Sequence, residues 1–226
     1  MLGLHGWGRT HRDLVGCLEG TDAITLDLPG FGASPAPPAA GGAAAYADLL
    51  APALDECAAR IVVVGHSFGG RVAVELAVRW PDRVASLALC GVPLLHRTDR
   101  PAAKPALRFR LARGLHRRGL LGEATMERMR QRFGSADYRN ATGVMREVLV
   151  AVVNETYGEQ LSRITQPVEL VWGRHDDAAP VEIALKAEQL LADARLTVID
   201  GVAHDVPAEA PDALAVAVRR LVGQLS

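Results

Sequence analysis

The run Ile61–Val64 is apolar at every position, and the residues Gly-His-Ser-Phe-Gly follow it directly. A strand with one solvated face alternates apolar and polar residues, whereas a strand covered on both faces does not. Ile61–Val64 therefore predicts a central strand of a parallel sheet with helices on both sides. Parallel strands need long crossover connections, and these are usually helices.

Short apolar runs and helix-patterned segments alternate along most of the 226 residues. Strands are expected at Met1–Leu4, Ala23–Leu26, Ile61–Val64, Val84–Leu89, Val168–Trp172 and Leu196–Ile199. Helices are expected at Ala43–Ala59, Gly70–Trp80, Val181–Leu191 and Pro211–Val222. This repetition indicates an α/β fold with a mostly parallel sheet, and the length suits one domain with an insertion.

Residues 93–165 interrupt the alternation, because they are patterned as helices with no strand between them. The expected helices are Ala103–Leu120, Glu123–Arg132 and Tyr138–Thr156. The chain therefore divides into a core, residues 1–92 and 166–226, and an inserted helical segment, residues 93–165. Residues 97–132 within the insertion carry a net charge of +8, and the rest of the chain carries −9.

Composition excludes several classes of protein. Hydrophobic residues make up 49% of the chain and charged residues 23%, which excludes a disordered protein. No apolar run approaches the roughly 18 residues of a membrane span, and the N-terminus lacks the pattern of a secretory signal. The pI near 6.7 argues against nucleic-acid binding. Three scattered cysteines are typical of a reducing compartment, so a cytoplasmic protein without membrane or nucleic-acid partners is expected.

The pentapeptide Gly65–Gly69 carries the strongest chemical signal. Its serine, Ser67, would sit on a sharp turn between strand and helix, where small flanking residues leave room for unusual backbone angles. The helix N-terminus behind it favours developing negative charge. A chance Gly-Ser-Gly turn is the alternative. The predicted strand before it and the helix after it favour a nucleophile.

Other polar loops follow predicted strands. LHGWG, residues 4–8, would place the backbone N–H of Trp7 beside that of Phe68, and two such donors form an oxyanion hole. The remaining loops are DLPGFG at 27–32, WGRHDD at 172–177 and GVAH at 201–204. No cysteine or histidine cluster has the spacing of metal ligands.

Together these pieces resemble the α/β-hydrolase superfamily. The matching segments are spread along nearly the whole chain apart from a divergent middle: LHGWG, DLPGFGAS, GHSFGG, VWGRHDDAAP and GVAHDVPAEAP. The resemblance implies Ser67 as nucleophile, His204 as base and Asp176 as the acid that orients the base. The order Ser, Asp, His is the one associated with this fold. It also implies that residues 93–165 form a cap over the active site, and that no cofactor or metal is needed.

The chain offers competitors for two of these roles. His204 is the only histidine after the final predicted strand, whereas His175 comes too early to be the base. The family spacing G-x-x-D-x-x-x-P selects Asp176, with Asp177 as the alternative one residue away. His5 is expected to brace the oxyanion loop, and it is grouped with Trp7 and Phe68 as a substrate-binding residue.

The sequence departs from the family at its start. The usual fold has two further strands before the LHG loop, but Met1 lies only four residues before His5, so neither strand is expected here; a misplaced start site and a truly minimal core are the alternative explanations. In the family's strand order Ala23–Leu26 then becomes an edge of the sheet. An unpaired edge favours association with other chains.

The expected function is hydrolysis of small-molecule carboxylic esters with small or medium acyl chains. The same triad also serves carbon–carbon bond hydrolases and a lyase of menaquinone synthesis, and some receptors of this fold only bind a small ligand. Apolar residues of the insertion either line an acyl pocket or, as we favour, pack the cap on the core: Leu107, Leu111, Met126, Met129, Val144 and Leu149. The basic block is either a solvated face or a docking surface for an acidic carrier protein, as the resemblance to pimeloyl-carrier methyl ester esterases suggests.

Overall fold

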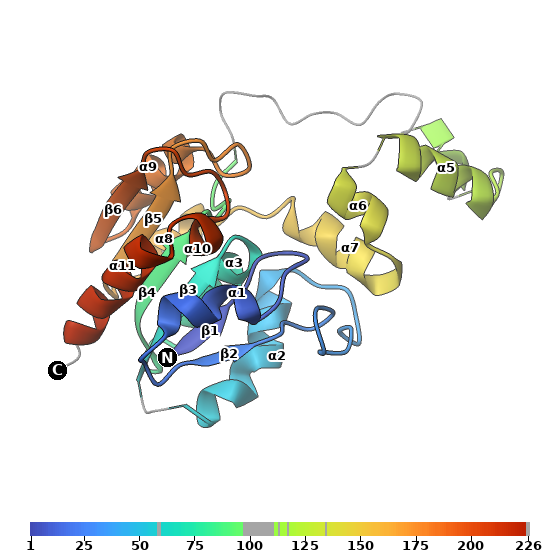
Figure 1. Cartoon of the computed structure of the whole chain (residues 1–226). Coiled ribbons are helices and arrows are strands. Elements are labelled where there is room, and N and C mark those ends of the chain that lie inside the picture. The colour runs from blue at the N-terminus through green and yellow to red at the C-terminus, as the bar shows by residue number, and fades with distance from the viewer. Residues whose placement is uncertain (58–59, 97–110, 113, 117, 134, 225–226) are drawn as a thin grey trace.

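The computed structural model contains a six-stranded sheet in the order β2-β1-β3-β4-β5-β6, and every neighbouring pair is parallel (Figure 1). The structure describes residues 1–57, 60–96, 111–112, 114–116, 118–133 and 135–224. The strands are β1 Leu2–Leu4, β2 Ile24–Leu26, β3 Ile61–His66, β4 Val84–Cys90, β5 Val168–Gly173 and β6 Ala194–Ile199. The predicted α/β fold is confirmed, and all six predicted strands are present within two residues of their expected bounds.

Helices cover both faces of the sheet. On β3, Val63 enters a hydrophobic cluster with helices of one face, while Val62 and Val64 enter a second cluster with helices of the other face. The first face carries α2 Ala43–Asp55, α3 Phe68–Arg79 and α9 Val181–Leu190. The second carries α1 Arg12–Val15, the 3-10 helix η1 Gly16–Leu18, α10 Val206–Glu209 and α11 Pro211–Gly223. Ile61–Val64 is apolar throughout because its alternate residues enter two separate cores.

The inserted segment is helical where the structure describes it. Its helices are α5 Glu123–Phe133, α6 Ala136–Asn140, α7 Gly143–Val152 and α8 Gly158–Arg163. The single helix predicted at Tyr138–Thr156 is divided into α6 and α7, because Ala141 and Thr142 are extended and Gly143 has a φ of 51°. Most of the helix predicted at Ala103–Leu120 lies outside the described residues, although 111–112 and 114–116 are helical.

The end of the inserted segment packs on the core. Leu161 of α8 and its neighbours Tyr157 and Ile164 are buried in the same cluster as α3. Helix α7 adds Val148 and Val152 to that cluster. In Figure 1, α7 lies between the core and helices α5 and α6. Residues 143–164 therefore connect the insertion to the face of the sheet that carries α3.

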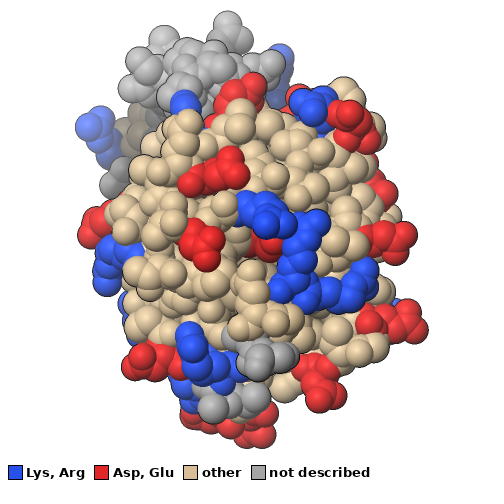
Figure 2. All heavy atoms as spheres, turned by 90° about the vertical axis from the view of Figure 1, so that its left-hand side faces the viewer, with Lys and Arg blue, Asp and Glu red and all other residues tan. Residues whose placement is uncertain are grey.

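The two edges of the sheet differ. As predicted, β2 is an edge strand that pairs with β1, and its Ile24 is 41% exposed. Figure 2 shows the side of β6, where a band of Lys and Arg lies among scattered Asp and Glu. Buried Glu169 of β5 contacts Arg195 and Arg220. This face therefore carries both signs of charge.

None of the described helices is long and apolar enough to span a bilayer.

Candidate active site

Ser67 lies on the turn between β3 and α3, where the backbone is strained. Its φ is 50° and its ψ −112°, and it is the only non-glycine residue with positive φ in the described part of the chain. A Cβ added at Gly65 would lie 2.5 Å from the Cα of Gly70, and one at Gly69 would lie 2.2 Å from the carbonyl oxygen of Leu4. The sharp turn predicted from the sequence is present, and its glycines are required by close backbone contacts.

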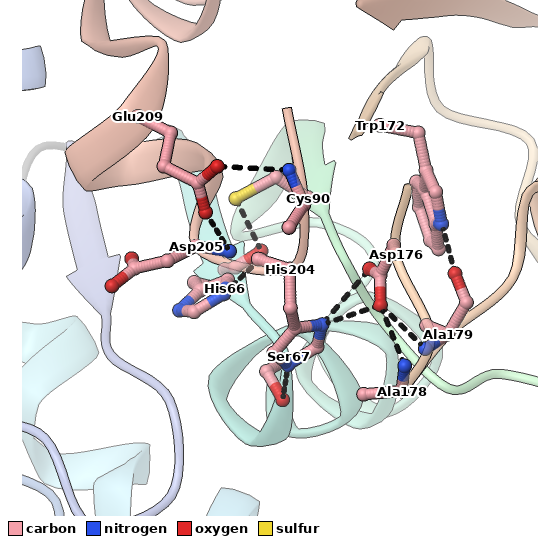
Figure 3. Close-up of polar contacts among 12 residues, drawn as sticks. His66, Ser67, Cys90, Trp172, Asp176, Ala178, Ala179, His204, Asp205 and Glu209 are labelled. Carbon is pink, nitrogen blue, oxygen red and sulfur yellow. Dashed lines mark hydrogen bonds and ion pairs between the residues drawn. The ribbon is translucent and has the colours of Figure 1, made fainter. Parts of the chain in front are cut away.

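Hydrogen bonds connect Ser67, His204 and Asp176, which follow β3, β6 and β5 (Figure 3). Nε2 of His204 lies 3.0 Å from Oγ of Ser67. Nδ1 of His204 lies 2.8 Å and 2.9 Å from the two carboxylate oxygens of Asp176. An ionised carboxylate only accepts hydrogen bonds, so Nδ1 carries the proton and the lone pair of Nε2 faces the serine hydroxyl.

The loop after β5 holds Asp176 in place. Its side chain is fully buried, and Oδ1 accepts hydrogen bonds from the backbone N–H of Ala178 at 2.9 Å and of Ala179 at 2.7 Å. These donors stabilise the ionised carboxylate. The neighbouring Asp177 is exposed. Asp176 is therefore the acid that contacts His204, as the sequence spacing predicts.

Two residues that the sequence analysis did not assign to the site hold the loop of His204. Nε2–H of His66 donates to the His204 carbonyl at 3.0 Å. The carboxylate of Glu209 accepts from the backbone N–H groups on either side of His204, those of Ala203 at 2.9 Å and Asp205 at 3.2 Å. Glu209 lies five residues after His204, so an acid at this spacing is the signal that could have identified it.

His5 is placed inside the protein, not on the wall of the site. It is fully buried, Nε2 accepts from the backbone N–H of Leu28 at 2.9 Å, and Nδ1 contacts the Gly6 carbonyl oxygen at 2.7 Å. Burial lowers the pKa of His5, and because Nε2 accepts a hydrogen bond the ring is neutral. Grouping His5 with the substrate-binding residues is therefore corrected, because both ring nitrogens are used within the fold. Its role is the bracing of the LHGWG loop.

Trp7 and Phe68 do face the site. The carbonyl of His5 accepts from Gly69 N–H at 3.1 Å, which ties the LHGWG loop to the start of α3. The rings of Trp7 and Phe68 are in edge contact, with centroids 5.5 Å apart. Within the described residues, neither backbone N–H has a hydrogen-bond acceptor. Two unpaired donors therefore flank the Ser67 turn.

A cavity of about 560 Å³ opens beside Ser67. Its wall combines apolar residues, among them Trp7, Phe68, Leu95, Leu149, Val152 and Ile183, with the charged residues Arg9, Arg71, Asp137, Glu155 and Asp205. Of the residues in the inserted segment that the sequence suggested for an acyl pocket, Leu149 lines this cavity. Met126 is buried beside Ala112, Val144 packs against the core and Leu111 is 59% exposed. Leu107 and the Met129 side chain lie outside the described part of the chain.

The comparisons place the chain in a family. The family model described as "Alpha/beta hydrolase family" matches residues 1–218, so the chain belongs to this family. A 2-hydroxy-6-oxononadienedioate/2-hydroxy-6-oxononatrienedioate hydrolase from Pseudomonas sp is 26% identical over 220 residues, covering 89% of this chain and 77% of the relative. A pimeloyl-[acyl-carrier protein] methyl ester esterase from Aromatoleum aromaticum is 29% identical over 246 residues, covering 97% and 96%.

A solved structure supports the same class. A thermophilic esterase from Thermogutta terrifontis, studied with malate bound, matches with a TM-score of 0.73 and 26% identity, covering 99% of this chain and 89% of that chain. The chain is therefore a hydrolase of the α/β-hydrolase family. Among the described residues, no three His, Cys, Asp or Glu side chains are arranged to hold a metal ion.

Proposed function

We propose that this hydrolase cleaves carboxylic esters of small or medium acyl chains, with Ser67 as nucleophile, His204 as base and Asp176 as the residue that orients His204. The observation that carries the proposal is the continuous chain of contacts from Ser67 Oγ through both ring nitrogens of His204 to the buried Asp176. The cavity beside the nucleophile, with its apolar side chains, provides space for an acyl chain.

The reaction proceeds in two halves. Nε2 of His204 takes the proton of Ser67 as Oγ attacks the ester carbonyl, and the tetrahedral intermediate then expels the alcohol, which receives that proton. A water molecule next attacks the acyl-serine with His204 as base, and the acid leaves as Ser67 regains its proton. Asp176 fixes the tautomer of His204 and stabilises the imidazolium in both halves.

The backbone N–H groups of Trp7 and Phe68 bind the oxyanion of each tetrahedral intermediate. Their free donors flank the Ser67 turn, and the bond from Gly69 to His5 fixes one loop against the other. Such preorganised donors stabilise charge that develops in the transition state more than the neutral ester. Loss of one donor of this kind typically costs a factor of about 10²–10³ in kcat.

Hydrolysis of p-nitrophenyl esters from acetate to decanoate tests the proposal, with Ser67→Ala as the matched variant. We expect turnover with a preferred chain length and its loss in Ser67→Ala, while thermal unfolding shows that the variant is folded. Turnover by Ser67→Ala near that of the parent would refute the assignment. A protein that reacts with a fluorophosphonate at Ser67 but hydrolyses no ester would be a lyase or a narrower hydrolase. A protein that does neither would favour a ligand receptor.

The similarity to a 2-hydroxy-6-oxononadienedioate/2-hydroxy-6-oxononatrienedioate hydrolase favours a second candidate, hydrolysis of a carbon–carbon bond in a dienoic acid by the same three residues. Absorbance of a conjugated dienoate, which is lost on cleavage, separates the two reactions. Turnover of the dienoate without turnover of any ester would select this candidate.

Docking of an acidic carrier protein on residues 97–132 also stays a proposal. It is supported by the net charge of +8 and by the similarity to a pimeloyl-[acyl-carrier protein] methyl ester esterase. Much of this block lies outside the described residues. The association rate with a carrier-bound ester should fall as salt is added, because salt screens charge attraction. Kinetics that do not depend on salt would remove the proposal.

A further inference from the structure

Arg71 lies one helical turn after Ser67 on α3. Its backbone N–H donates to the Ser67 carbonyl at 3.3 Å, and both residues line the same cavity. Side chains of a helix lean toward its N-terminus, so Arg71 leans toward the end that carries Ser67. Arg71 is only 7% exposed. The structure therefore places a buried cation on the wall of a cavity whose other charged lining residues are Arg9, Asp137, Glu155 and Asp205.

The guanidinium of Arg71 is only partly satisfied. Nη1 donates to the carbonyl of Val152, the last residue of α7, and Cζ lies 5.8 Å from the centroid of the Tyr157 ring. Nε is shielded from solvent and has no acceptor. Burial lowers the pKa of Arg71, but a guanidinium keeps its charge in proteins. Within the described residues, no carboxylate forms an ion pair with it.

Glu155, the acid whose charge acts on Arg71, also lines the cavity, but its carboxylate is hydrogen-bonded to other groups. Both oxygens of Glu155 lie 3.2 Å from the backbone N–H of Ala43, which begins α2, and one of them accepts from the Tyr157 hydroxyl. A helix N-terminus favours a negative charge, so this position suits Glu155. Its charge raises the pKa of Arg71, yet the carboxylate does not contact the guanidinium. The cation therefore remains available to a ligand in the cavity.

We propose that Arg71 binds a carboxylate group of the substrate, so that the preferred substrates are short esters carrying a free carboxylate on the acyl chain. This inference rests on the proposed esterase function. Because Nη1 is occupied by Val152 and Nε is shielded from solvent, Nη2 is the guanidinium nitrogen left for an oxygen of the carboxylate. Water competes less for a guanidinium that is only 7% exposed, which strengthens such a charge-assisted pair.

Matched pairs of substrates test this proposal. Monomethyl succinate, adipate and suberate are compared with the methyl esters of butanoic, hexanoic and octanoic acid, which have the same chain lengths but no second carboxylate. We expect kcat/KM to favour the charged ester at one or more lengths by about tenfold or more. In Arg71→Gln this preference should fall on the order of 10- to 100-fold. Arg71→Lys, which keeps the charge but not the planar guanidinium, should retain part of it.

The control variant is Arg79→Gln, on the same helix but away from the cavity, where Arg79 contacts Asp48. It should leave the preference unchanged. If wild type shows no preference, or if Arg71→Gln lowers kcat/KM equally for both esters of a pair, then Arg71 only anchors α7 and the proposal is wrong. If wild type hydrolyses neither ester of any pair, nor any p-nitrophenyl ester, the esterase function itself fails.

A binding measurement covers the case in which Arg71→Gln does not fold. Calorimetry with folded Ser67→Ala compares adipate with adipamide, which has the same length but no charge. Adipate should bind about tenfold or more tightly, and equal affinities would refute the proposal.

Discussion

His66, inside the Ser67 turn, gives the fold a pH-dependent contribution to stability that can be isolated. The residue is 3% exposed, and its Nδ1 is buried without a partner. Burial, followed by the charge of His204, lowers the pKa of His66 from 6.5 to about 4. The folded protein therefore keeps this ring neutral, whereas the unfolded chain protonates it near pH 6.5.

The sign follows from proton binding. Between pH 6.5 and pH 4 the unfolded chain binds more protons at this position than the folded protein, so the free energy of unfolding falls as the pH falls. The contribution of His66 is fully present above pH 6.5 and is lost as the pH approaches 4. The loss amounts to roughly 2 kcal/mol at pH 5 and roughly 3 kcal/mol at pH 4.

His66→Gln is the matched change, because its amide can donate near the position of Nε2 but does not titrate. Urea unfolding followed by tryptophan fluorescence, from about pH 7.5 to about pH 4.5, gives both free energies. Between pH 7.5 and pH 5, the free energy of unfolding of wild type should fall by roughly 2 kcal/mol more than that of His66→Gln. The exposed His175→Gln serves as control. Parallel curves for wild type and His66→Gln would show that the folded ring protonates normally and would refute the reasoning.

Three further predictions concern the loops around His204. Asp176→Asn should lower kcat for p-nitrophenyl esters by a factor of about 10⁴, because His204 takes the wrong tautomer. If Asp177→Asn shows this loss and Asp176→Asn does not, the assignment of Asp176 as the orienting acid is wrong. Glu209→Gln should lower kcat about 3- to 10-fold with little change in KM, because one amide oxygen cannot serve both flanking N–H groups; an unchanged kcat would remove Glu209 as a positioning residue. Gly91→Ala should lower the free energy of unfolding, measured in urea, by about 1–2 kcal/mol. Gly91 has a φ of 56°, and a Cβ there would lie 3.0 Å from the His204 carbonyl oxygen. An unchanged urea midpoint would show that the loop accommodates the Cβ without strain.

The strands and the Ser67 turn were predictable because their signals are local. Ile61–Val64 is apolar throughout since both faces of β3 are covered, and this pattern stands in the sequence itself. Gly65 similarly marks a close contact with the backbone of Gly70 in the same turn, whereas the contact of Gly69 is with the distant Leu4. The spacing from Gly173 to Pro180 selected the acid that contacts His204.

The partners of buried polar side chains were not predictable in the same way. His5 was grouped with substrate-binding residues because it precedes Trp7, yet its Nε2 accepts from Leu28, which the sheet brings beside it. Arg71 contacts the carbonyl of Val152, 81 residues away in the sequence. Such pairs depend on which loops meet in space, and a single sequence carries no local mark of them.

The positive φ of Ser67 also limits how this site can change during evolution. A left-handed backbone crowds the Cβ, and a β-branched side chain makes that crowding much worse. Threonine, although it carries a hydroxyl and differs from serine by one methyl group, is therefore a poor replacement at position 67. Cysteine and aspartate are unbranched at Cβ and fit the same turn. On this backbone the nucleophile can therefore change from a hydroxyl to a thiol or a carboxylate. Replacement of the serine hydroxyl by the threonine hydroxyl is disfavoured.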